Sequence, residues 1–573
     1  PRLGQSLGRP AHGGGLVGNG HHQDQVMSLS ALTRSKNLTT LQNQVFDLLI
    51  IGGGINGAGI ARDAASRGMK VALIEAKDFA IGTSSRSSKL IHGGIRYLEN
   101  MEFGLVFEAL SERRRLFELA PHLVHPLRFA IPVYKGGRVS PWLMGLGMFL
   151  YDALALFETP EPAARMSEAE VKEHLPLLSQ KNLQAVFAYS DAYMDDDRLV
   201  IETLRSAARF GALAVNYVRA EGATHTTDGK IQSVQATDQL GGQKLTIRAH
   251  HFVSTVGPWT DLVAPNLLPD WRPHMRPSKG VHLTFTRERL PLQQAVVMGA
   301  EQRIVFGIPR HEMVIVGTTD TDFTADPYSV HTTREDVQYL LQVIDHYFPA
   351  AQIKERDIVA SYSGVRPLVD DQSATESKTS REHQILTDAR GLTVVMGGKY
   401  TTYRLMAEQA VESCLGQFSF EEQMQFQKSR TLEPLNPLIT SDLYTEKELG
   451  LKRLLRDFDQ PVLLLRALFE RHGTEGAQIL QKYADDMVGL NNWEEKLWAL
   501  EAAHAIHQTA CQNVADFLLR RTPLVLSRAD HGRPVIEAVS RVFQRHLGLS
   551  DAELNKQIKA WDEEMKQEMG WRV

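Results

Sequence analysis

Short apolar runs near the start of the chain are typical of strands that are buried on both faces of a sheet. Phe46–Ile51 and Val71–Ile74 are such runs, and a stretch of helical length, Ile55–Arg67, lies between them. Gly68 follows that stretch at the place where a helix often ends in the left-handed conformation. The pattern therefore predicts a βαβ unit at residues 46–74.

Later segments alternate or run apolar and are separated by Gly-rich turn signals, which is typical of antiparallel strands. The expected strands are 213–219, 231–237, 244–249, 251–256, 281–286, 303–309, 313–319 and 392–396. Helices are expected at 102–119 and 197–210. Beyond Pro437 the chain is predicted to be helical almost to its end, with one long run at 493–521.

A glycine-rich segment joins the first strand to its helix. Gly52-Gly53-Gly54-Ile55-Asn56-Gly57 fits GxGxxG, in which glycines allow a tight turn and a close approach to a pyrophosphate. Glu75 ends the next strand, 18 residues after Gly57, near the spacing of about 20 expected for an acid that binds a ribose. The segment therefore predicts a site for the ADP part of a dinucleotide, and the acid disfavours NADP.

The loop alone does not separate NAD from FAD. Three later features favour the longer FAD, which would lie across the fold: the expected β-meander after residue 213, the strand that ends at Thr255-Val256-Gly257-Pro258, and the second glycine pair, Gly397-Gly398. FAD is therefore the predicted cofactor.

The predicted fold class is α/β + α. It combines a Rossmann-like FAD-binding domain of the glutathione-reductase and D-amino-acid-oxidase type with an antiparallel β substrate domain and a C-terminal helical domain. Residues 44–125, 185–270 and 385–415 are assigned to the first, 126–184 and 271–384 to the second, and 430–573 to the third. Residues 1–43 are expected to lie outside the fold as a disordered or expression-derived leader, with Met27 as a candidate native start.

Composition limits the functions that remain. The 573 residues exceed one compact domain, and the net charge of −5 gives no sign of nucleic-acid binding. The two cysteines, Cys414 and Cys511, form no metal-ligand spacing, so no metal is predicted and a reducing compartment is the simplest location. Asp195-Asp196-Asp197 does not fit a calcium loop, and we expect these acids to cap the helix that follows.

Trp142–Tyr151 is a conspicuous apolar run that is too short to span a membrane. Two interpretations stay open. The run could be a buried helix, or it could make a shallow contact with a membrane surface, to which Lys135 and Arg138 would contribute positive charge.

A more specific pattern lies at residues 83–98, which read TSSRSSKLIHGGIRYL. This segment resembles the FAD-dependent (respiratory, aerobic) glycerol-3-phosphate dehydrogenase family, as do GTTD at 317–320, YSGVRPL at 362–368 and GGKYTTYR at 397–404. The resemblance implies oxidation of sn-glycerol 3-phosphate to dihydroxyacetone phosphate, with hydride passing to flavin N5 and electrons to membrane quinone. It also implies a peripheral protein on the cytoplasmic face of the inner membrane, and it leaves a homodimer open.

The substrate of that family is a small phosphate dianion with a secondary alcohol, and arginine suits phosphate because it binds bidentately. Cations in the matching segments, with one tyrosine, are therefore predicted to bind it: Arg96, Tyr97, Arg303, Arg381 and Lys399. Arg366 is predicted to stabilise the alkoxide that develops at C2. Removal of the hydroxyl proton needs a base near neutral pH, and both His282 and His92 are candidates.

The cofactor is expected to contact the glycine-rich loop, the Ser-rich segment and the second glycine pair. The predicted cofactor-binding residues are Gly52, Gly54, Asn56, Gly57, Glu75, Thr83, Ser84, Ser88, Lys89, Leu90, Gly257, Gly398, Lys399 and Thr401.

Three other functions compete with the respiratory dehydrogenase. An oxidase of the same family would reduce O2 to peroxide, although the inserted segment that such oxidases tend to carry is not obvious here. A flavin amino-acid oxidase shares the fold class but would need to recognise a carboxylate instead of a phosphate. A flavoprotein sensor would keep its flavin oxidised with every candidate substrate.

Overall fold

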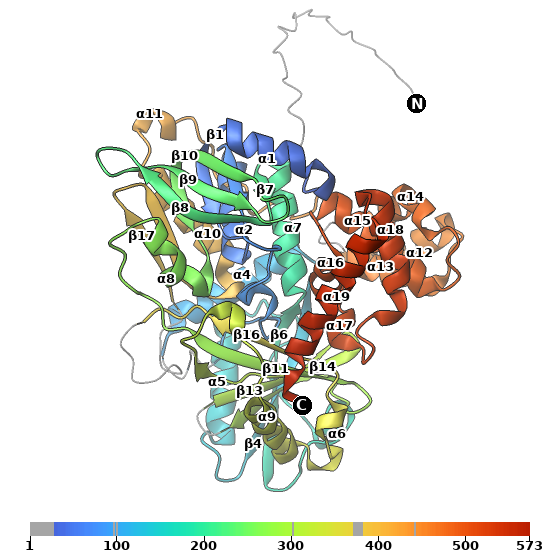
Figure 1. The fold of residues 1–573 in the computed structure, drawn as a ribbon. Helices are drawn as coiled ribbons and strands as arrows, with labels where there is room; N and C mark the ends of the chain where they lie inside the picture. Colours follow the sequence, from blue (N-terminus) through green and yellow to red (C-terminus); the bar gives the residue numbers. More distant parts are fainter. Residues whose placement is uncertain are drawn as a thin grey trace, which may run out of the picture.

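The structure is a computed structural model that describes residues 28–95, 98, 101–300, 303–370, 382–439 and 443–572, with side chains from residue 449 onward in the last segment. Two sheets and a group of C-terminal helices make up the molecule (Figure 1). This arrangement confirms the predicted α/β + α fold class. Among the described residues, no helix combines the length and the apolar character needed to cross a bilayer.

The first sheet has the strand order β17-β18-β10-β1-β2-β7, with the meander strands β8 and β9 attached to β10. Its strands are β1 Val45–Ile51, β2 Val71–Ile74, β7 Leu213–Val215, β8 Val218–His225, β9 Ile231–Asp238, β10 Lys244–Ser254, β17 His383–Asp388 and β18 Leu392–Gly397. β1 pairs in parallel with both β2 and β10, and β10 pairs in parallel with β18. The predicted βαβ unit is confirmed at the centre of this sheet.

Burial on both faces explains the unbroken apolar run of β1. Leu48 and Ile50 pack into the core under α2 (Ile55–Ser66), α7 (Asp196–Arg209) and α10 (Tyr403–Leu415). Leu49 and Ile51 pack on the opposite face, toward the meander. A strand with helices on one side and strands on the other has no polar face.

The second sheet has the order β15-β11-β14-β13-β12-β4-β6-β3, with β16 paired to β11 and β5 to β6. Its strands are β3 Leu90–Ile91, β4 Val124–Tyr134, β5 Ala164–Arg165, β6 Leu183–Met194, β11 Ser278–Thr286, β12 Ala295–Ala300, β13 Arg303–Arg310, β14 Met313–Gly317, β15 Thr321–Asp322 and β16 Ser361–Arg366. α9 (Arg334–Tyr347) covers one core of this sheet. α4 (Phe103–Leu119) and α5 (Pro141–Leu154) pack at another.

The C-terminal helices are α12 Leu443–Asp457, α13 Val462–His472, α14 Glu475–Lys482, α15 Trp493–Gln508, α16 Val514–Arg520, α17 Leu524–Ser527, α18 Ile536–Leu547 and α19 Asp551–Glu568. They lie beside the first sheet, and α19 runs from this group toward the second sheet (Figure 1). The remaining α-helices whose bounds lie within the described residues are α1 Arg34–Asn43, α6 Glu168–His174, α8 Thr260–Val263 and α11 Phe420–Gln423.

Two expectations from the sequence are wrong. The helical run predicted at 493–521 breaks between α15 and α16, because Ala510 is left-handed and Asn513 caps the new helix by accepting from the Asp516 N–H at 2.8 Å. Residues 31–43 belong to the fold, since Leu38 and Leu41 of α1 are buried against the first sheet. Two apolar residues in a mostly polar helix are too few to stand out in the sequence. Residues 1–27 lie outside the described residues.

Segments assigned to the FAD-binding part also differ from the sheet pairing. Leu90–Ile91 form β3, which pairs with β6 in the second sheet. Residues 185–194, placed with the FAD-binding part, belong to β6 and pair with β4 in the second sheet. β6 runs into α7 through Asp195 alone, so no turn signal marks the change.

Candidate active site

A cavity of about 620 Å³ lies at the carboxyl ends of β1, β2, β10 and β18. This is where open parallel sheets bind nucleotides, and the volume is in the usual range for a ligand site. Nine of the predicted cofactor residues line it: Gly52, Gly54, Asn56, Glu75, Thr83, Ser84, Gly257, Gly398 and Lys399. Gly57, Ser88, Lys89, Leu90 and Thr401 are not among its lining residues.

The glycine-rich loop fits the pyrophosphate of FAD. Gly52 has φ of +113°, and a Cβ there would lie 2.7 Å from the Thr255 carbonyl oxygen, so only glycine is accommodated. The first turn of α2 follows; Gly54, the cap residue, has no side chain of its own, and Ser84 Oγ accepts from the Ile55 N–H at 3.0 Å. A helix start of this kind presents N–H donors and a positive dipole end to an anion.

Glu75 occupies the position expected for a ribose-binding acid. Its carboxylate accepts from the Gly53 N–H at 2.7 Å and from the Lys77 N–H at 2.9 Å. Burial raises the pKa of Glu75 above its ordinary value, and these two hydrogen bonds oppose that rise. An ionised carboxylate has about four acceptor positions, so this group can still accept a ribose hydroxyl.

The Ser-rich segment is held by a buried carboxylate outside the cavity. Asp196 pairs with the Lys89 ammonium, which is 1% exposed, and accepts from Ser87 Oγ at 2.7 Å. Lys89 itself is left-handed, with φ of +55°. The charge of Lys89 is therefore satisfied by Asp196 at the start of α7, and its role at the cofactor stays a prediction.

The acids at the start of α7 make ion pairs more than caps. Asp195 has no capping hydrogen bond from its side chain and pairs instead with Arg310 at 2.5 Å. Asp196 accepts from the Asp197 N–H, while its main partner is Lys89. The expectation of capping by all three acids is therefore wrong for Asp195, because buried cations from other elements compete for it.

Arg366 ends β16 and lies across the neighbouring strand β11. Its guanidinium donates to Asp320 at 2.9 Å, to Thr318 Oγ1 at 2.8 Å and to the Thr319 carbonyl at 3.0 Å. A Cβ at Gly280 would lie 2.5 Å from Nη2, so the guanidinium can occupy this position only because residue 280 is glycine. Arg366 is therefore fixed in orientation by the turn at 318–320 and by β11.

His282 lies on β11, one position beyond Val281, and is 2% exposed. Its ring stacks on Tyr362 with centroids 4.7 Å apart, and its Nε2 is 2.9 Å from Ser88 Oγ. Burial lowers the pKa of His282 well below 6.5, and the charges of Arg366 and Lys89 lower it further. His282 is therefore neutral at physiological pH, and its lowered pKa makes it a weaker base than the base near neutral pH that the sequence predicts.

The other predicted site residues are only partly described. The His92 N–H donates to Thr401 Oγ1 at 3.2 Å, and its ring packs edge-on against Phe306 at 6.4 Å. Arg303 opens β13, and Lys399 lines the cavity. Arg96, Tyr97 and Arg381 lie outside the described residues, so the phosphate end of the substrate site stays a prediction.

Several residues at this site carry no signal in the sequence. Trp259, Asp326, Tyr328 and the segment 218–221 line the cavity, although they come from distant parts of the chain. Gly280 is needed for Arg366 but belongs to no glycine motif. These residues reach the site only through contacts with distant segments, so the sequence alone could not identify them.

One group of potential metal ligands lies elsewhere. His472, Glu475 and His504 place ligand atoms within 4.8 Å of one another among the described residues. Glu475 is already bonded by Arg205 and Asn436, at 2.5 and 2.8 Å. A cation would have to displace an arginine here, so we assign no metal to this group.

Comparisons with known proteins identify the family of the chain. Residues 47–404 match the family described as FAD dependent oxidoreductase, and residues 438–554 match the C-terminal domain of alpha-glycerophosphate oxidase. The aerobic glycerol-3-phosphate dehydrogenase of Staphylococcus aureus (strain USA300) is 33% identical over 94% of this chain and 97% of that protein. The protein of the same name from Staphylococcus saprophyticus is 37% identical over 71% of this chain and 73% of its own.

A solved structure extends the similarity to three dimensions. The glycerol-3-phosphate dehydrogenase from Bacillus halodurans, complexed with FAD, has a TM-score of 0.75 at 27% identity and covers 94% of this chain and 98% of that chain. The predicted fold class, cofactor and family are thereby confirmed. The chain belongs to the FAD-dependent oxidoreductases and, among them, to the family of aerobic glycerol-3-phosphate dehydrogenases.

Proposed function

We propose that this protein oxidises sn-glycerol 3-phosphate to dihydroxyacetone phosphate and passes the electrons to a membrane quinone. The observation that carries the proposal is the 33% identity to the Staphylococcus aureus dehydrogenase over 94% of the chain. FAD, when bound, supplies the acceptor for the hydride that leaves C2.

The chain's own residues suit the remaining tasks. Arg366, fixed by Asp320 and Thr318, directs positive charge to the oxygen on C2 as negative charge develops there. His282, kept neutral by burial, removes the hydroxyl proton, and the Ser88 hydroxyl 2.9 Å away orients its ring. Lys399, Arg303, Arg96 and Arg381 are the proposed phosphate ligands.

Anaerobic reduction of the flavin tests the reaction. Glycerol 3-phosphate should bleach the flavin absorbance of the holoenzyme, whereas glycine and sarcosine should leave it unchanged. Bleaching by glycine or sarcosine alone would indicate an amino-acid oxidase. Flavin that stays oxidised with all three compounds would indicate a sensor without this activity.

The electron acceptor needs a separate test. With glycerol 3-phosphate and a quinone analogue, turnover should be fast, and with O2 alone it should be slow. Rapid stoichiometric peroxide in the absence of quinone would overturn the dehydrogenase in favour of an oxidase.

His282→Gln should lower kcat by about 100-fold, the lower range for loss of a general base. A base with a depressed pKa is neutral above that pKa. Wild-type kcat should therefore stay level as the pH falls to 6.5 and decline only below it, where the imidazole gains a proton. The variant should lack this acid limb in a profile of kcat against pH.

His251→Gln is the matched control, because His251 is a buried strand histidine that bonds Thr393 outside the cavity lining. It should keep both turnover and the acid limb. An unchanged limb in His282→Gln would instead assign the base to His92 or to solvent.

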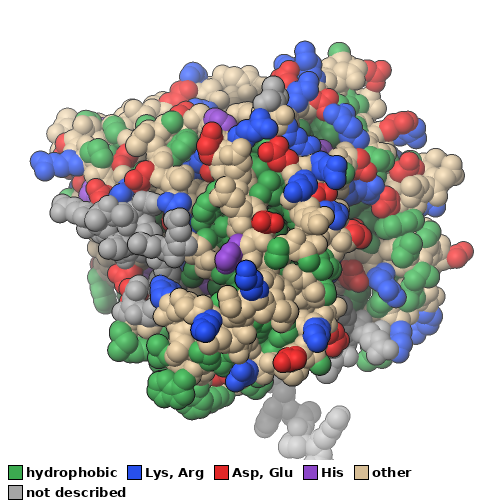
Figure 2. Space-filling model, turned by 90° about the horizontal axis from the view of Figure 1, so that it is seen from below, with side chains coloured by type: hydrophobic (Ala, Val, Ile, Leu, Met, Phe, Trp, Pro, Cys, Tyr) green, Lys and Arg blue, Asp and Glu red, His purple; other side chains and the backbone are tan. Residues whose placement is uncertain are grey.

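α5 presents an apolar face that we propose as the membrane contact. The exposed side chains on α5 and the turn after it are Trp142, Leu143, Leu146, Phe149, Leu150, Leu156 and Phe157. Met148 and Tyr151 face the protein core, so one side of the helix is buried and the other is exposed, and the buried-helix interpretation is not supported. Figure 2 shows hydrophobic side chains gathered at the lower left of the face it draws.

Charge next to this face favours a lipid surface over a protein partner. Lys135 and Arg138 are exposed just before the helix, and Trp142 at its first turn is 76% exposed. Aromatic and apolar side chains that enter the acyl region, with cations at the headgroups, are typical of an interfacial helix. The proposed location is therefore peripheral, on the cytoplasmic face of the inner membrane.

Replacing Trp142 and Phe149 with serine should reduce binding to vesicles that contain anionic lipid by at least tenfold, because two large apolar groups no longer enter the bilayer. Flotation of the holoenzyme with vesicles measures this. Phe420→Ser, at a residue that is also 76% exposed but lies on α11, should float like the wild type. Equal flotation of all three proteins would exclude α5 as the contact.

A further inference from the structure

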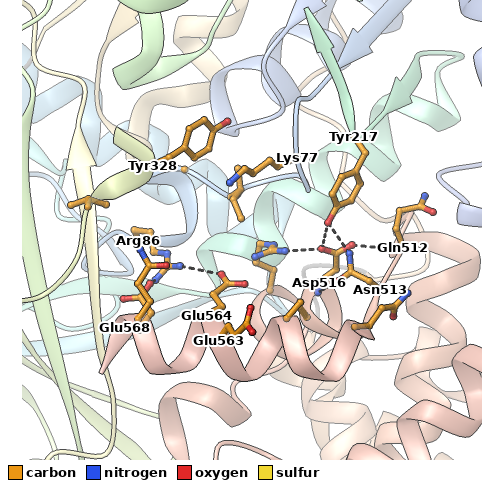
Figure 3. Close-up of a pocket in the computed structure, with 18 of the residues that line it drawn as sticks. Lys77, Arg86, Tyr217, Tyr328, Gln512, Asn513, Asp516, Glu563, Glu564 and Glu568 are labelled. Atoms are coloured by element: carbon orange, nitrogen blue, oxygen red, sulfur yellow. Dashed lines mark hydrogen bonds and ion pairs between the residues drawn. The ribbon is translucent and has the colours of Figure 1, made fainter. Parts of the chain in front are cut away.

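A second cavity lies next to the FAD cavity and shares a wall with it. It has a volume of about 990 Å³ and is bounded by α19 on one side and by residues that follow β2 on the other (Figure 3). Trp259 and Tyr328 line both cavities, together with Pro258 and the turn 81–83. These two aromatic side chains therefore form part of the wall between the FAD cavity and the open cleft.

This part of the wall is a stack of three side chains from separate parts of the chain. The Trp259 and Tyr328 rings have centroids 4.5 Å apart. The Lys77 ammonium lies over the Tyr328 ring, 4.0 Å from its centroid, and Figure 3 shows the two side chains together above the cleft. An ammonium over an aromatic face and a close pair of rings are each attractive contacts.

Two members of the stack, Lys77 and Trp259, contact residues that line the cofactor cavity. Lys77 donates its backbone N–H to Glu75, the predicted ribose ligand, at 2.9 Å. Trp259 lies against Gly82 so closely that a Cβ there would be 2.8 Å from its ring. Both residues therefore belong to the rigid surroundings of the glycine-rich loop.

Tyr328 is the member that comes from outside. It lies on a short 3-10 turn, Pro327–Ser329, between β15 and α9 of the second sheet. Asp326 caps this turn by accepting from the Tyr328 N–H at 2.9 Å. Burial and the negative charge of Glu75 raise the pKa of Tyr328 to about 12, so the phenol stays uncharged at physiological pH.

From this geometry we propose that Tyr328, Trp259 and Lys77 form a latch that retains FAD. The latch spans from a loop of the second sheet to the nucleotide-binding turns of the first, over the adenosine end of the cofactor cavity. FAD held without a covalent bond leaves only when such contacts open. Tyr328 is a positioning residue for the cofactor, and its effect is on FAD release and not on the reacting atoms.

The rate of FAD release tests the latch. Tyr328→Ala should release FAD about tenfold faster than the wild type, because both the ring pair and the ammonium contact are lost. Tyr328→Phe keeps the ring and should stay within about twofold of the wild type. Recovery of free-flavin fluorescence after rapid dilution of the holoenzyme gives the rate, and titration of apoprotein with FAD gives the matching equilibrium constant.

Coupling between the members of the latch provides a second measurement. Lys77→Met should speed release by about threefold in the wild type but have almost no effect in Tyr328→Ala, because its aromatic partner is already absent. Additive effects of the two substitutions would overturn the proposal. So would equal release from Tyr328→Ala and wild type, or equally fast release from Tyr328→Phe and Tyr328→Ala.

Trp259→Leu gives the same test if Tyr328→Ala does not fold, since it removes the ring pair and leaves Tyr328 in place. It should release FAD several-fold faster, and wild-type release from this variant would overturn the latch. The measurement does not depend on the substrate. Failure of the latch and failure of the proposed reaction are therefore distinguishable.

Discussion

Arg366→Ala is expected to lower kcat for glycerol 3-phosphate by about 1,000-fold while FAD stays bound. Removing one donor to a developing oxyanion lowers kcat by about 100- to 1,000-fold in other enzymes. Removal of Arg366 also leaves the carboxylate of Asp320, which is 8% exposed, without its ion-pair partner. The guanidinium lies on the second sheet and does not line the FAD cavity, so cofactor binding should be spared. Steady-state turnover and the flavin absorbance of the purified protein measure the two effects separately.

Two further variants show whether the loss of kcat in Arg366→Ala comes from the lost geometry of the guanidinium or from its lost charge. Arg366→Lys should recover only a small part of kcat, because one ammonium cannot replace a planar fork that bonds Asp320, Thr318 and Thr319 together. Arg276→Ala removes an arginine that pairs with the half-exposed Asp322 nearby, and it should keep near-normal kcat. If the kcat of Arg366→Ala is within tenfold of the wild-type kcat, Arg366 does not act on the reacting atoms.

Local sequence patterns explain why the strands and the glycine-rich loop of the first sheet could be predicted from the sequence. β1 is apolar on both faces, and a turn that must be glycine at residue 52 follows it, so the strand, the loop and the site are all encoded within a few residues. The same holds for β11 and β13, whose apolar runs appear in both sequence and structure. An apolar pattern within one strand can be recognised without knowing which element packs against that strand.

Contacts between distant residues could not be predicted in this way. Lys89 occurs in a conspicuous motif, yet its ammonium pairs with Asp196, 107 residues later, which the sequence assigned to capping. Whether the apolar helix α5 is covered or exposed depends on which elements pack beside it, and the sequence left this open. Tyr328 reaches the FAD cavity from the second sheet, and no motif accompanies it.

Buried charges between the two ends of the chain are a further long-range feature. Asp78, which is 0% exposed, bonds Arg520 at 2.5 Å and Arg521 at 3.0 Å, and it accepts from Asn216 at 3.1 Å. The carboxylate follows β2 in the FAD-binding part, whereas both arginines lie at the end of α16. Breaking a buried pair is costly because the partner that remains is a charge without compensation.

Asp78→Asn should therefore lower the free energy of unfolding by about 3 kcal/mol or more. Arg520 keeps its ion pair with Asp516 at 2.8 Å, so the uncompensated charge is mainly that of Arg521. The other acceptors of Arg521 are the Thr509 hydroxyl and the Thr509 and Asp516 carbonyls, all uncharged. Urea unfolding of the holoprotein, followed by tryptophan fluorescence, gives the change. Glu537→Gln, which breaks an exposed pair with Arg541, should change it by less than about 0.5 kcal/mol.

The pH dependence separates lost charge from altered packing. Burial alone would raise the pKa of Asp78, but the guanidinium groups of Arg521 and Arg520 bring it below its ordinary 3.8. A carboxyl with a lowered pKa contributes its full stability above the unfolded value and loses it as the pH falls through the folded one. Burial and the charge of Asp78 raise the pKa of Asp516 to about 6, so the wild type and Asp78→Asn should differ by a constant amount only from about pH 7 to 8, where Asp516 is ionised in both. The two proteins should converge below pH 4. A difference that persists at low pH would mean that the substitution acts through packing, and that the link between α16 and the FAD-binding part does not depend on this charge.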